Sequence, residues 1–387
     1  MAKAVRGIQP KLLAWARMSL GYTEEEVAAR LKVDARDVAA WESGIGAPTY
    51  TQLEDLAYRI YKRPLAVFFL PEPPPERSLK QEFRTLPDFD LDGLTADTRY
   101  QLRLARFYQL SLRELNDEIN PAPRKIFRDH ALTVTANIPR AAARVREYLE
   151  ISVVQQGSWK SNEDALSAWR NAVEDTGVFV FKHGFKQQDI SGFCLLDTEF
   201  PIIYLNNGAS KTRQIFSLVH ELAHLLLSVN SISKFEDSYV ERLPQKERLI
   251  EQFCNSFAAE FLVPSHDFAK QITGRDSFDD EAIQDLADLY RVSREVVLRR
   301  LLERGMVEPN QYQDRVKQWT NETRGRSSGG NYYSTQTAYL GDHYLRLVFG
   351  KHYQGKLNLE QVADYLGVKT RSVAGIEARL LQRVAAE

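Results

Sequence analysis

The sequence predicts a mainly α-helical protein with one small β-sheet, an α+β fold. Apolar residues recur at helical spacing over most of the chain, whereas two short apolar runs, residues 191–197 and 201–207, have the composition of strands. Four prolines within residues 70–78 mark a linker behind an N-terminal helical unit. With 387 residues, the chain is long enough for two or three domains.

We expect five regions along the chain. They are a helix-turn-helix domain with its proline-rich linker at residues 1–78, a helical connecting region at 79–150, the domain holding both strands at 151–310, a linker at 311–331 and a C-terminal helical unit at 332–387. The second linker is inferred from a polar run rich in Gly and Ser at residues 320–331. Residues 358–381 repeat a helix, a turn at Gly367 and a helix, which we interpret as a packing unit.

The N-terminal region carries a helix-turn-helix pattern. A helix is predicted at residues 24–31, a turn at 32–33 and a second helix at 34–41, with the small Ala28 where the two helices cross. The ending Trp41, Glu42, Ser43, Gly44 resembles the XRE, or Cro/repressor-like, family. The resemblance implies that the second helix would lie in the major groove of DNA.

Charge opposes DNA binding by this region. Residues 23–42 contain six acidic and three basic side chains, where phosphate contacts would need positive charge. Arg36, Arg17 and Lys11 are the candidate DNA contacts. The alternative is a helical domain for dimerisation or for docking a partner protein, and homodimerisation of the chain is left open.

An HExxH pattern lies in the apolar helical stretch FSLVHELAHLLLS, residues 216–228. His220 and His224 are one helical turn apart, so both imidazoles leave the same face and can bind one metal ion. Zinc is the expected metal, because imidazole suits it and a catalytic site leaves one position to water. Glu221 follows the first histidine, where its carboxylate can take a proton from that water.

A third metal ligand is expected downstream of the two histidines. Residues 249–262 have helical spacing, and Glu251 and Asn255 share one face of that helix at i and i+4. We favour Glu251 as the ligand, with Asn255 holding a histidine in place. Glu247, one turn earlier, is the rival. The full set of candidates is Glu236, Asp237, Glu241, Glu247, Glu251 and Glu260.

These residues resemble the ImmA/IrrE metallopeptidases. The similarity covers LNNGASKTRQIFSLVHELAHLLLS and then EQFCNSFAAEFLVP at residues 251–264. The resemblance implies a gluzincin-like peptidase domain with zinc ligands His220, His224 and Glu251, Glu221 as general base, and an edge strand that pairs with an extended substrate. His266, Tyr204, Tyr239, Tyr332 and Tyr333 are further candidates for stabilising an oxyanion.

Composition excludes several classes of protein and of metal site. The net charge is −1, so any DNA contact must come from a local patch, and two cysteines are too few for a disulfide framework or a Cys-type zinc site. No apolar stretch has the length of a membrane span, and we expect a cytoplasmic protein with no membrane partner.

Two functions are carried forward from the sequence. The first is a zinc-dependent endopeptidase, coupled to a repressor-like domain, that cuts a regulatory protein such as a repressor or a toxin-associated partner. The alternative is a DNA-binding transcriptional regulator, or the antitoxin of a toxin-antitoxin module, in which the metallopeptidase fold is a sensor or scaffold.

Overall fold

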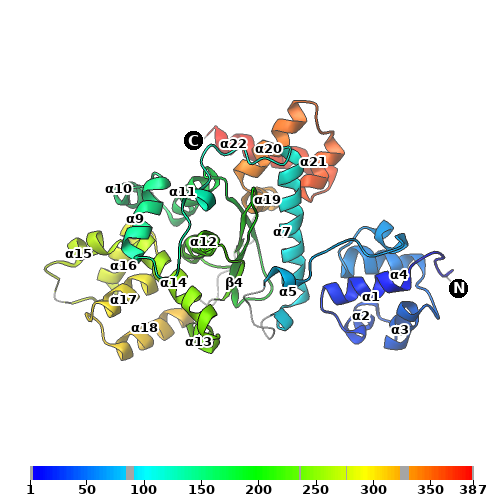
Figure 1. Cartoon of the computed structure of the whole chain (residues 1–387), viewed down its shortest axis with the longest axis horizontal. Coiled ribbons are helices and arrows are strands. Elements are labelled where there is room, and N and C mark those ends of the chain that lie inside the picture. The colour runs from blue at the N-terminus through cyan, green and yellow to red at the C-terminus, as the bar shows by residue number, and fades with distance from the viewer. Residues whose placement is uncertain (1–2, 84–90, 235–236, 276, 323–330, 386–387) are drawn as a thin grey trace. The chain divides into compact units, whose positions relative to one another are not determined.

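A computed structural model describes residues 3–83, 91–234, 237–275, 277–322 and 331–385. It confirms the mainly helical α+β fold (Figure 1). The chain forms two compact units, Met1–Leu104 with Phe185–Gln187, and Ala105–Gly184 with Gln188–Glu387. Within the described residues, no helix is both long and apolar enough to cross a membrane. The domain boundaries predicted at residues 78, 150 and 310 stay predictions.

The first unit contains the predicted helix-turn-helix. Helices α2 (Glu24–Leu31) and α3 (Ala35–Ser43) each begin with a capping box, at Thr23 and Asp34, which satisfies the free N–H groups of the first turn. Lys32, directly after α2, has a left-handed backbone with a φ of 59°, so the chain turns sharply where α2 ends. The other elements are α1 (Pro10–Ser19), α4 (Tyr50–Glu54), a π-helical turn (Asp55–Ile60), a 3₁₀ turn (Leu65–Phe69) and α5 (Leu79–Glu82).

The second unit is built on a four-stranded sheet of order β1-β3-β2-β4. Its strands are β1 (Phe179–His183), β2 (Ile190–Leu195), β3 (Ile202–Asn206) and β4 (Ser231–Lys234). Strand β1 pairs with β3 in parallel, and the other two pairings are antiparallel. The two predicted strands are the two central ones. Neither edge strand is predicted from the sequence: β4 has only four residues, and β1 is a short apolar strand of five residues directly after the turn at residues 175–177.

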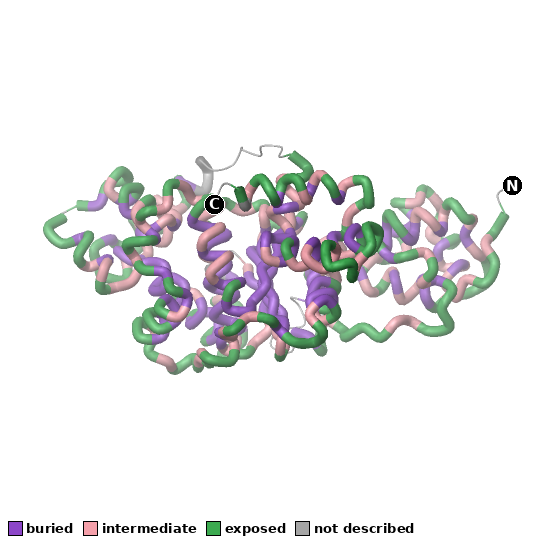
Figure 2. The backbone as a smooth tube through the Cα atoms, turned by 90° about the horizontal axis from the view of Figure 1, so that it is seen from above, coloured by how far each residue is buried: buried purple, intermediate pink, exposed green. Residues whose placement is uncertain are grey.

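Helices cover both faces of this sheet. Helix α12 (Lys211–Leu226) packs on β2 and β3, and α11 (Asn162–Glu174) packs on α12 and β1. Successive strand residues face opposite sides. Val180 accordingly joins the α12 side, whereas Phe181 stacks on Tyr108 of α7 (Ala96–Leu115) with ring centroids 4.4 Å apart. The sheet and α12 form much of the buried centre of the unit (Figure 2).

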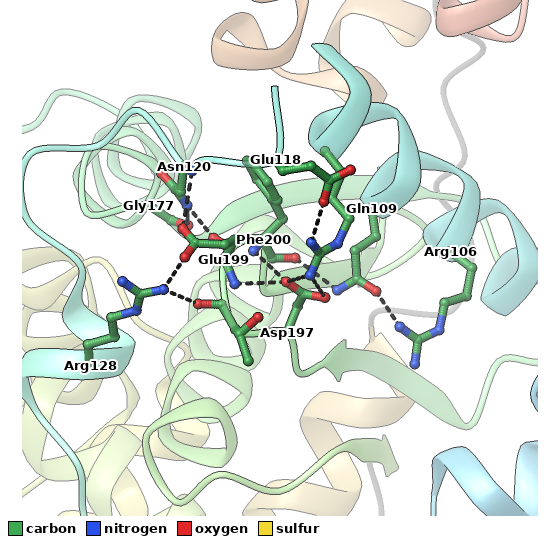
Figure 3. Close-up of polar contacts among 11 residues, drawn as sticks. Arg106, Gln109, Glu118, Asn120, Arg128, Gly177, Asp197, Glu199 and Phe200 are labelled. Carbon is green, nitrogen blue, oxygen red and sulfur yellow. Dashed lines mark hydrogen bonds and ion pairs between the residues drawn. The ribbon is translucent and has the colours of Figure 1, made fainter. Parts of the chain in front are cut away.

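A polar network fixes the C-terminal half of α7 to the β2–β3 loop (Figure 3). Arg113 donates two hydrogen bonds to the Asp197 carboxylate, at 2.7 and 2.8 Å, and Gln109 donates to the Phe200 carbonyl at 2.8 Å. Asn120, five residues after α7, donates to the Glu199 carbonyl of this loop and also to the Gly177 carbonyl before β1. These bonds hold the loop that connects the two central strands.

The remaining helices surround this core. They are α8 (Ile126–Asp129), α9 (Ile138–Tyr148), α10 (Val153–Ser158), α13 (Asp237–Arg242), α14 (Gln245–Leu262), α15 (Ser265–Ile272), α16 (Asp280–Tyr290), α17 (Arg294–Glu303), α18 (Pro309–Glu322), α19 (Tyr332–Leu340), α20 (Asp342–Tyr353), α21 (Leu359–Leu366), a 3₁₀ turn (Thr370–Ser372) and α22 (Val373–Val384).

The linker predicted at residues 311–331 differs from the structure. Helix α18 continues to Glu322, and its Trp319 is buried against the hydrophobic core with Arg294 over its ring at 4.5 Å. One large aromatic side chain outweighs the polar composition of its neighbours, because its burial contributes about 2 kcal/mol or more. Residues 323–330, the rest of that prediction, lie outside the described residues.

His343 at the start of α20 forms ion pairs with Glu174, the last residue of α11, and with Asp175, which follows α11. Its Nε2 lies 2.9 Å from Asp175 Oδ1, and its Nδ1 lies 3.3 Å from Glu174 Oε2. Burial lowers the pKa of His343, but the hydrogen bonds and charges of Glu174 and Asp175 outweigh burial and raise that pKa to about 9.

We expect the contribution of His343 to stability to be lost in alkaline solution. A raised folded-state pKa means that the contribution is fully present below about pH 6.5, the ordinary pKa of histidine, and disappears as the pH rises through about 9. The melting temperature of the wild-type chain should therefore exceed that of His343→Gln at pH 6, and the difference should shrink by pH 10. An unchanged difference would contradict the assignment.

Candidate metal centre

Helix α12 presents the two motif histidines to one point. Ser210 caps the helix by accepting a hydrogen bond from the Arg213 N–H. His220 and His224 are buried, one turn apart, and their Nε2 atoms lie 3.0 Å from each other. Two ring nitrogens held this close, with both rings leaving one helix face, form half of a metal-binding group.

Glu251 completes the group from α14, which packs against α12. Its Oε2 lies 3.3 Å from His220 Nε2, and its Oε1 lies 3.2 Å from His224 Nε2. A tetrahedral zinc ion with bonds of about 2.0–2.1 Å sets its ligand atoms about 3.3–3.4 Å apart. The spacing of the three side chains therefore fits a zinc ion, and they are buried as one group of potential ligands.

The electrostatics of the group favour an ionised carboxylate. Burial alone would raise the pKa of Glu251, but the charge of His224 and the hydrogen bonds of both histidines lower it well below its usual range. Burial would lower the pKa of His220, but Glu251 outweighs burial and raises it. Asn255, one turn after Glu251, lines the same cavity as His220 and contributes to raising the pKa of His220, and its role in holding a histidine in place stays a prediction.

Glu221 is fully buried beside this group. Its Oε2 accepts a hydrogen bond from Ser231 Oγ on β4, while its Oε1 has no hydrogen-bond partner among the described residues. A buried carboxylate oxygen left without a donor is costly, which fits a site that receives a water or a substrate. Ser231 Oγ also lies 3.2 Å from Cys194 Sγ, so β4 ties the carboxylate to the sheet.

A cavity of about 150 Å³ opens beside His220 and Glu251. Strand β4 contributes Ser233, whose buried Oγ has no hydrogen-bond partner within the described part of the chain. Ser231 and Ser233 share one face of the strand because side chains alternate along it. Neither serine is among the site residues predicted from the sequence. The alternation of serine with other residues in SISK, residues 231–234, was the only sequence signal for them.

The rival acidic ligands do not join the group. Glu260 is buried, but it accepts hydrogen bonds from Arg300 at 2.6 Å and from Ser265. Glu241 and Glu247 lie on α13 and α14 outside the group formed by the described residues. Glu236 and the side chain of Asp237 lie outside the described residues.

None of the candidates for stabilising an oxyanion is among the described residues that line this cavity. Tyr204 stacks on Phe193, on the face of the sheet opposite α12. His266 lines a different cavity, Tyr239 is buried with Lys234 over its ring, and Tyr332 and Tyr333 belong to α19. The geometry offers Ser233 in their place.

The predicted DNA contacts fare differently from one another. Arg17 donates to both carboxylate oxygens of Glu42, at 2.8 and 2.7 Å, with 15% of its side chain exposed. It therefore joins α1 to α3 through an ion pair, and its role as a DNA contact stays a prediction. Lys11 pairs with Glu72, and Arg36 is exposed on α3.

Comparison with known proteins agrees with this geometry. A family model described as the IrrE N-terminal-like domain matches residues 173–302, which contain the sheet, α12 and α14, and a helix-turn-helix model matches residues 13–57. The chain joins a helix-turn-helix domain to an IrrE-like domain. This confirms both resemblances seen in the sequence.

One curated relative is the radiation response metalloprotease IrrE of Deinococcus radiodurans. It is 35% identical over 115 residues, which cover 28% of this chain and 32% of the relative. The chain thus spans about a third of the length of that relative. The matched region resembles a metallopeptidase family, and the His220, His224 and Glu251 group within it could hold a metal ion.

Proposed function

We propose that the chain is a zinc-dependent endopeptidase that acts on a regulatory protein. The observation that carries this proposal is the buried group of His220, His224 and Glu251, with the buried Glu221 beside it. Zinc held there would polarise a substrate carbonyl and lower the pKa of a water molecule. The chain's own residues supply the remaining steps.

Glu221 is suited to move the proton. Its unpartnered Oε1 would take a proton from the attacking water and return it to the amine that leaves when the peptide bond breaks. Ser233 Oγ, also unpartnered, would donate to the carbonyl oxygen as negative charge develops there. Strand β4 lies at the end of the sheet, so an extended peptide can pair with it next to the cavity.

Ser231 is expected to act through Glu221 by fixing the orientation of its carboxylate. Ser231→Ala should lower kcat about 10- to 100-fold, the usual loss when a residue that orients a site group is removed, with KM nearly unchanged. Ser231→Thr keeps the hydroxyl and should restore most of the activity. Equal losses in both variants would contradict a role for the hydrogen bond.

The proposal is tested by digestion of a peptide library derived from a bacterial proteome. Zinc-loaded wild-type chain should generate new peptide termini, read by mass spectrometry, and Glu221→Gln should generate none. The residues around the cuts would identify the class of substrate. A wild-type protein without stoichiometric zinc, or a library cut equally by both proteins, would overturn the proposal.

The helix-turn-helix domain favours a second candidate function, a DNA-binding regulator or antitoxin in which the IrrE-like domain is a sensor. We expect that function to survive Glu221→Gln, because it uses no proton transfer. Binding of the variant to the promoter of its own gene in a gel shift, together with unchanged repression in cells, would support it. Loss of repression in the variant would exclude it.

A further inference from the structure

One combination of backbone and sequence occurs three times among the described residues. In each case a helix ends at a residue in the left-handed conformation, and the N–H of the following valine donates back to the carbonyl of an alanine five residues earlier. The left-handed residues are Lys32, Arg291 and Gly367, with φ of 59°, 54° and 65°. The bonds are Val33 to Ala28 at 3.1 Å, Val292 to Ala287 at 3.0 Å and Val368 to Ala363 at 3.0 Å.

The side chains of the three motifs match as well. A second valine lies five residues after the first and is buried in every case, as Val38, Val297 and Val373. The alanine is buried in every case too. The pairs α2–α3, α16–α17 and α21–α22 are therefore three helix-turn-helix units, which we term the first, second and third motifs.

The second helix of each motif has different surroundings. In the second motif, Ser293, Val296 and Arg299 line the cavity beside the metal group, so this helix is part of the peptidase-like site. In the third motif, Lys369, Thr370 and Arg371 are exposed, and the last two lie in the 3₁₀ turn (Thr370–Ser372) that leads into α22. Further along, Gly375 is covered by Tyr333, whose Cε1 would lie 2.3 Å from a Cβ at that position.

Charge separates the third motif from the first. Residues 358–384, which hold the third motif, contain four Lys and Arg against three Asp and Glu, whereas residues 23–42 contain six acidic and three basic side chains. The position before the second helix is Asp34 in the first motif and Ser293 in the second, and each caps its helix. The equivalent position in the third motif is Lys369, which precedes the 3₁₀ turn that leads into α22 and makes no capping hydrogen bond.

Positively charged side chains are unfavourable at the N-terminal end of a helix. The N-terminus of a helix carries partial positive charge, so Lys369 and Arg371 there are unfavourable unless an anion is close. Helix-turn-helix units place this end of the second helix at the DNA backbone and base edges. Basic side chains at this end complement phosphate, and the acidic first motif lacks this complementarity.

We propose that the third motif, α21 and α22 with Lys369 and Arg371, binds the phosphate backbone of duplex DNA. The exposed residues that lead into the second helix carry the contact, and α22 packs on α19, where Tyr333 covers Gly375. The proposal goes beyond peptidase activity and uses no residue of the metal group. It assigns DNA binding to a region that the sequence alone favours as a packing unit.

The test measures fluorescence anisotropy of a labelled duplex of 30 base pairs with the full-length chain between 50 and 200 mM NaCl. Lys369→Glu with Arg371→Glu should weaken binding at least about tenfold. It should also reduce the slope of log K against log salt by about 2, because two phosphates are no longer neutralised by the protein. Both side chains are exposed, so folding should be unchanged, as a thermal melt would verify.

Arg144→Glu with Lys246→Glu is the matched control. It makes the same change in net charge at exposed positions on α9 and α14, and it should leave the affinity nearly unchanged.

Arg36→Glu tests the first motif in the same assay. Equal weakening in the control, or binding abolished by Arg36→Glu but unaffected by Lys369→Glu with Arg371→Glu, would overturn the proposal. The proposal would also be overturned if the full-length chain bound an acidic protein through Lys369 and Arg371 but bound no duplex DNA. Running the assay in Glu221→Gln separates this result from the fate of the peptidase proposal.

Discussion

Glu221→Gln is expected to lower kcat about 10²- to 10⁴-fold, the usual contribution of a positioned general base. Glutamine has nearly the same shape and can still accept the hydrogen bond from Ser231, but its amide takes up no proton at neutral pH. The loss should therefore appear in kcat, with KM and zinc content close to wild type. Steady-state kinetics on a peptide found in the library digestion, with zinc measured on the same preparation, checks this expectation.

The control for this result is Glu241→Gln, an exposed carboxylate on α13 that lies outside the metal group. It changes charge by the same amount and should retain wild-type kcat. A Glu221→Gln protein that loses zinc along with activity would mean that the carboxylate holds the metal group together, and the proton-transfer role would then be wrong.

How far the sequence predicts this site depends on how local each interaction is. His220, Glu221 and His224 are adjacent on one helix, and Glu251 and Asn255 are one turn apart on another, so helical periodicity alone aligns each set. Bringing the two sets together requires α12 to pack on α14, which periodicity does not encode. The family resemblance supplied that step.

The interactions that escaped prediction depend on distant parts of the chain. Ser231 bonds Glu221 because β4 pairs with β2, and a four-residue strand gives too weak a pattern to place that pairing. The charge of Arg17 is visible in the sequence and makes it a candidate DNA contact, whereas its bond to Glu42 depends on how α1 crosses α3 and is not visible there. The third motif illustrates the reverse case, because the helix pattern was visible and its equivalence to the other two required the backbone.

Glu251→Ala is expected to lower zinc affinity by more than about 100-fold, because removing a direct ligand should cost more than the 10- to 100-fold effect of removing an outer hydrogen-bond partner. The variant retains two neutral imidazoles and loses the only carboxylate that the described residues bring to the group. Competition with a chromogenic chelator measures the affinity. Glu247→Ala, the rival one turn earlier on α14, is the matched control and should bind zinc as the wild type does.

Zinc binding should also appear as thermal stability. A ligand that binds only the folded state stabilises it by RT ln(1 + [L]/Kd), so at 100 times Kd the gain is about 2.7 kcal/mol. Wild type and Glu247→Ala should both melt at higher temperature with zinc, while Glu251→Ala should gain little at the same concentration. If Glu247→Ala loses the zinc-dependent gain and Glu251→Ala keeps it, the third ligand lies one turn earlier on α14, and the 3.2 and 3.3 Å distances from Glu251 to the histidines reflect an ion pair and not a metal site.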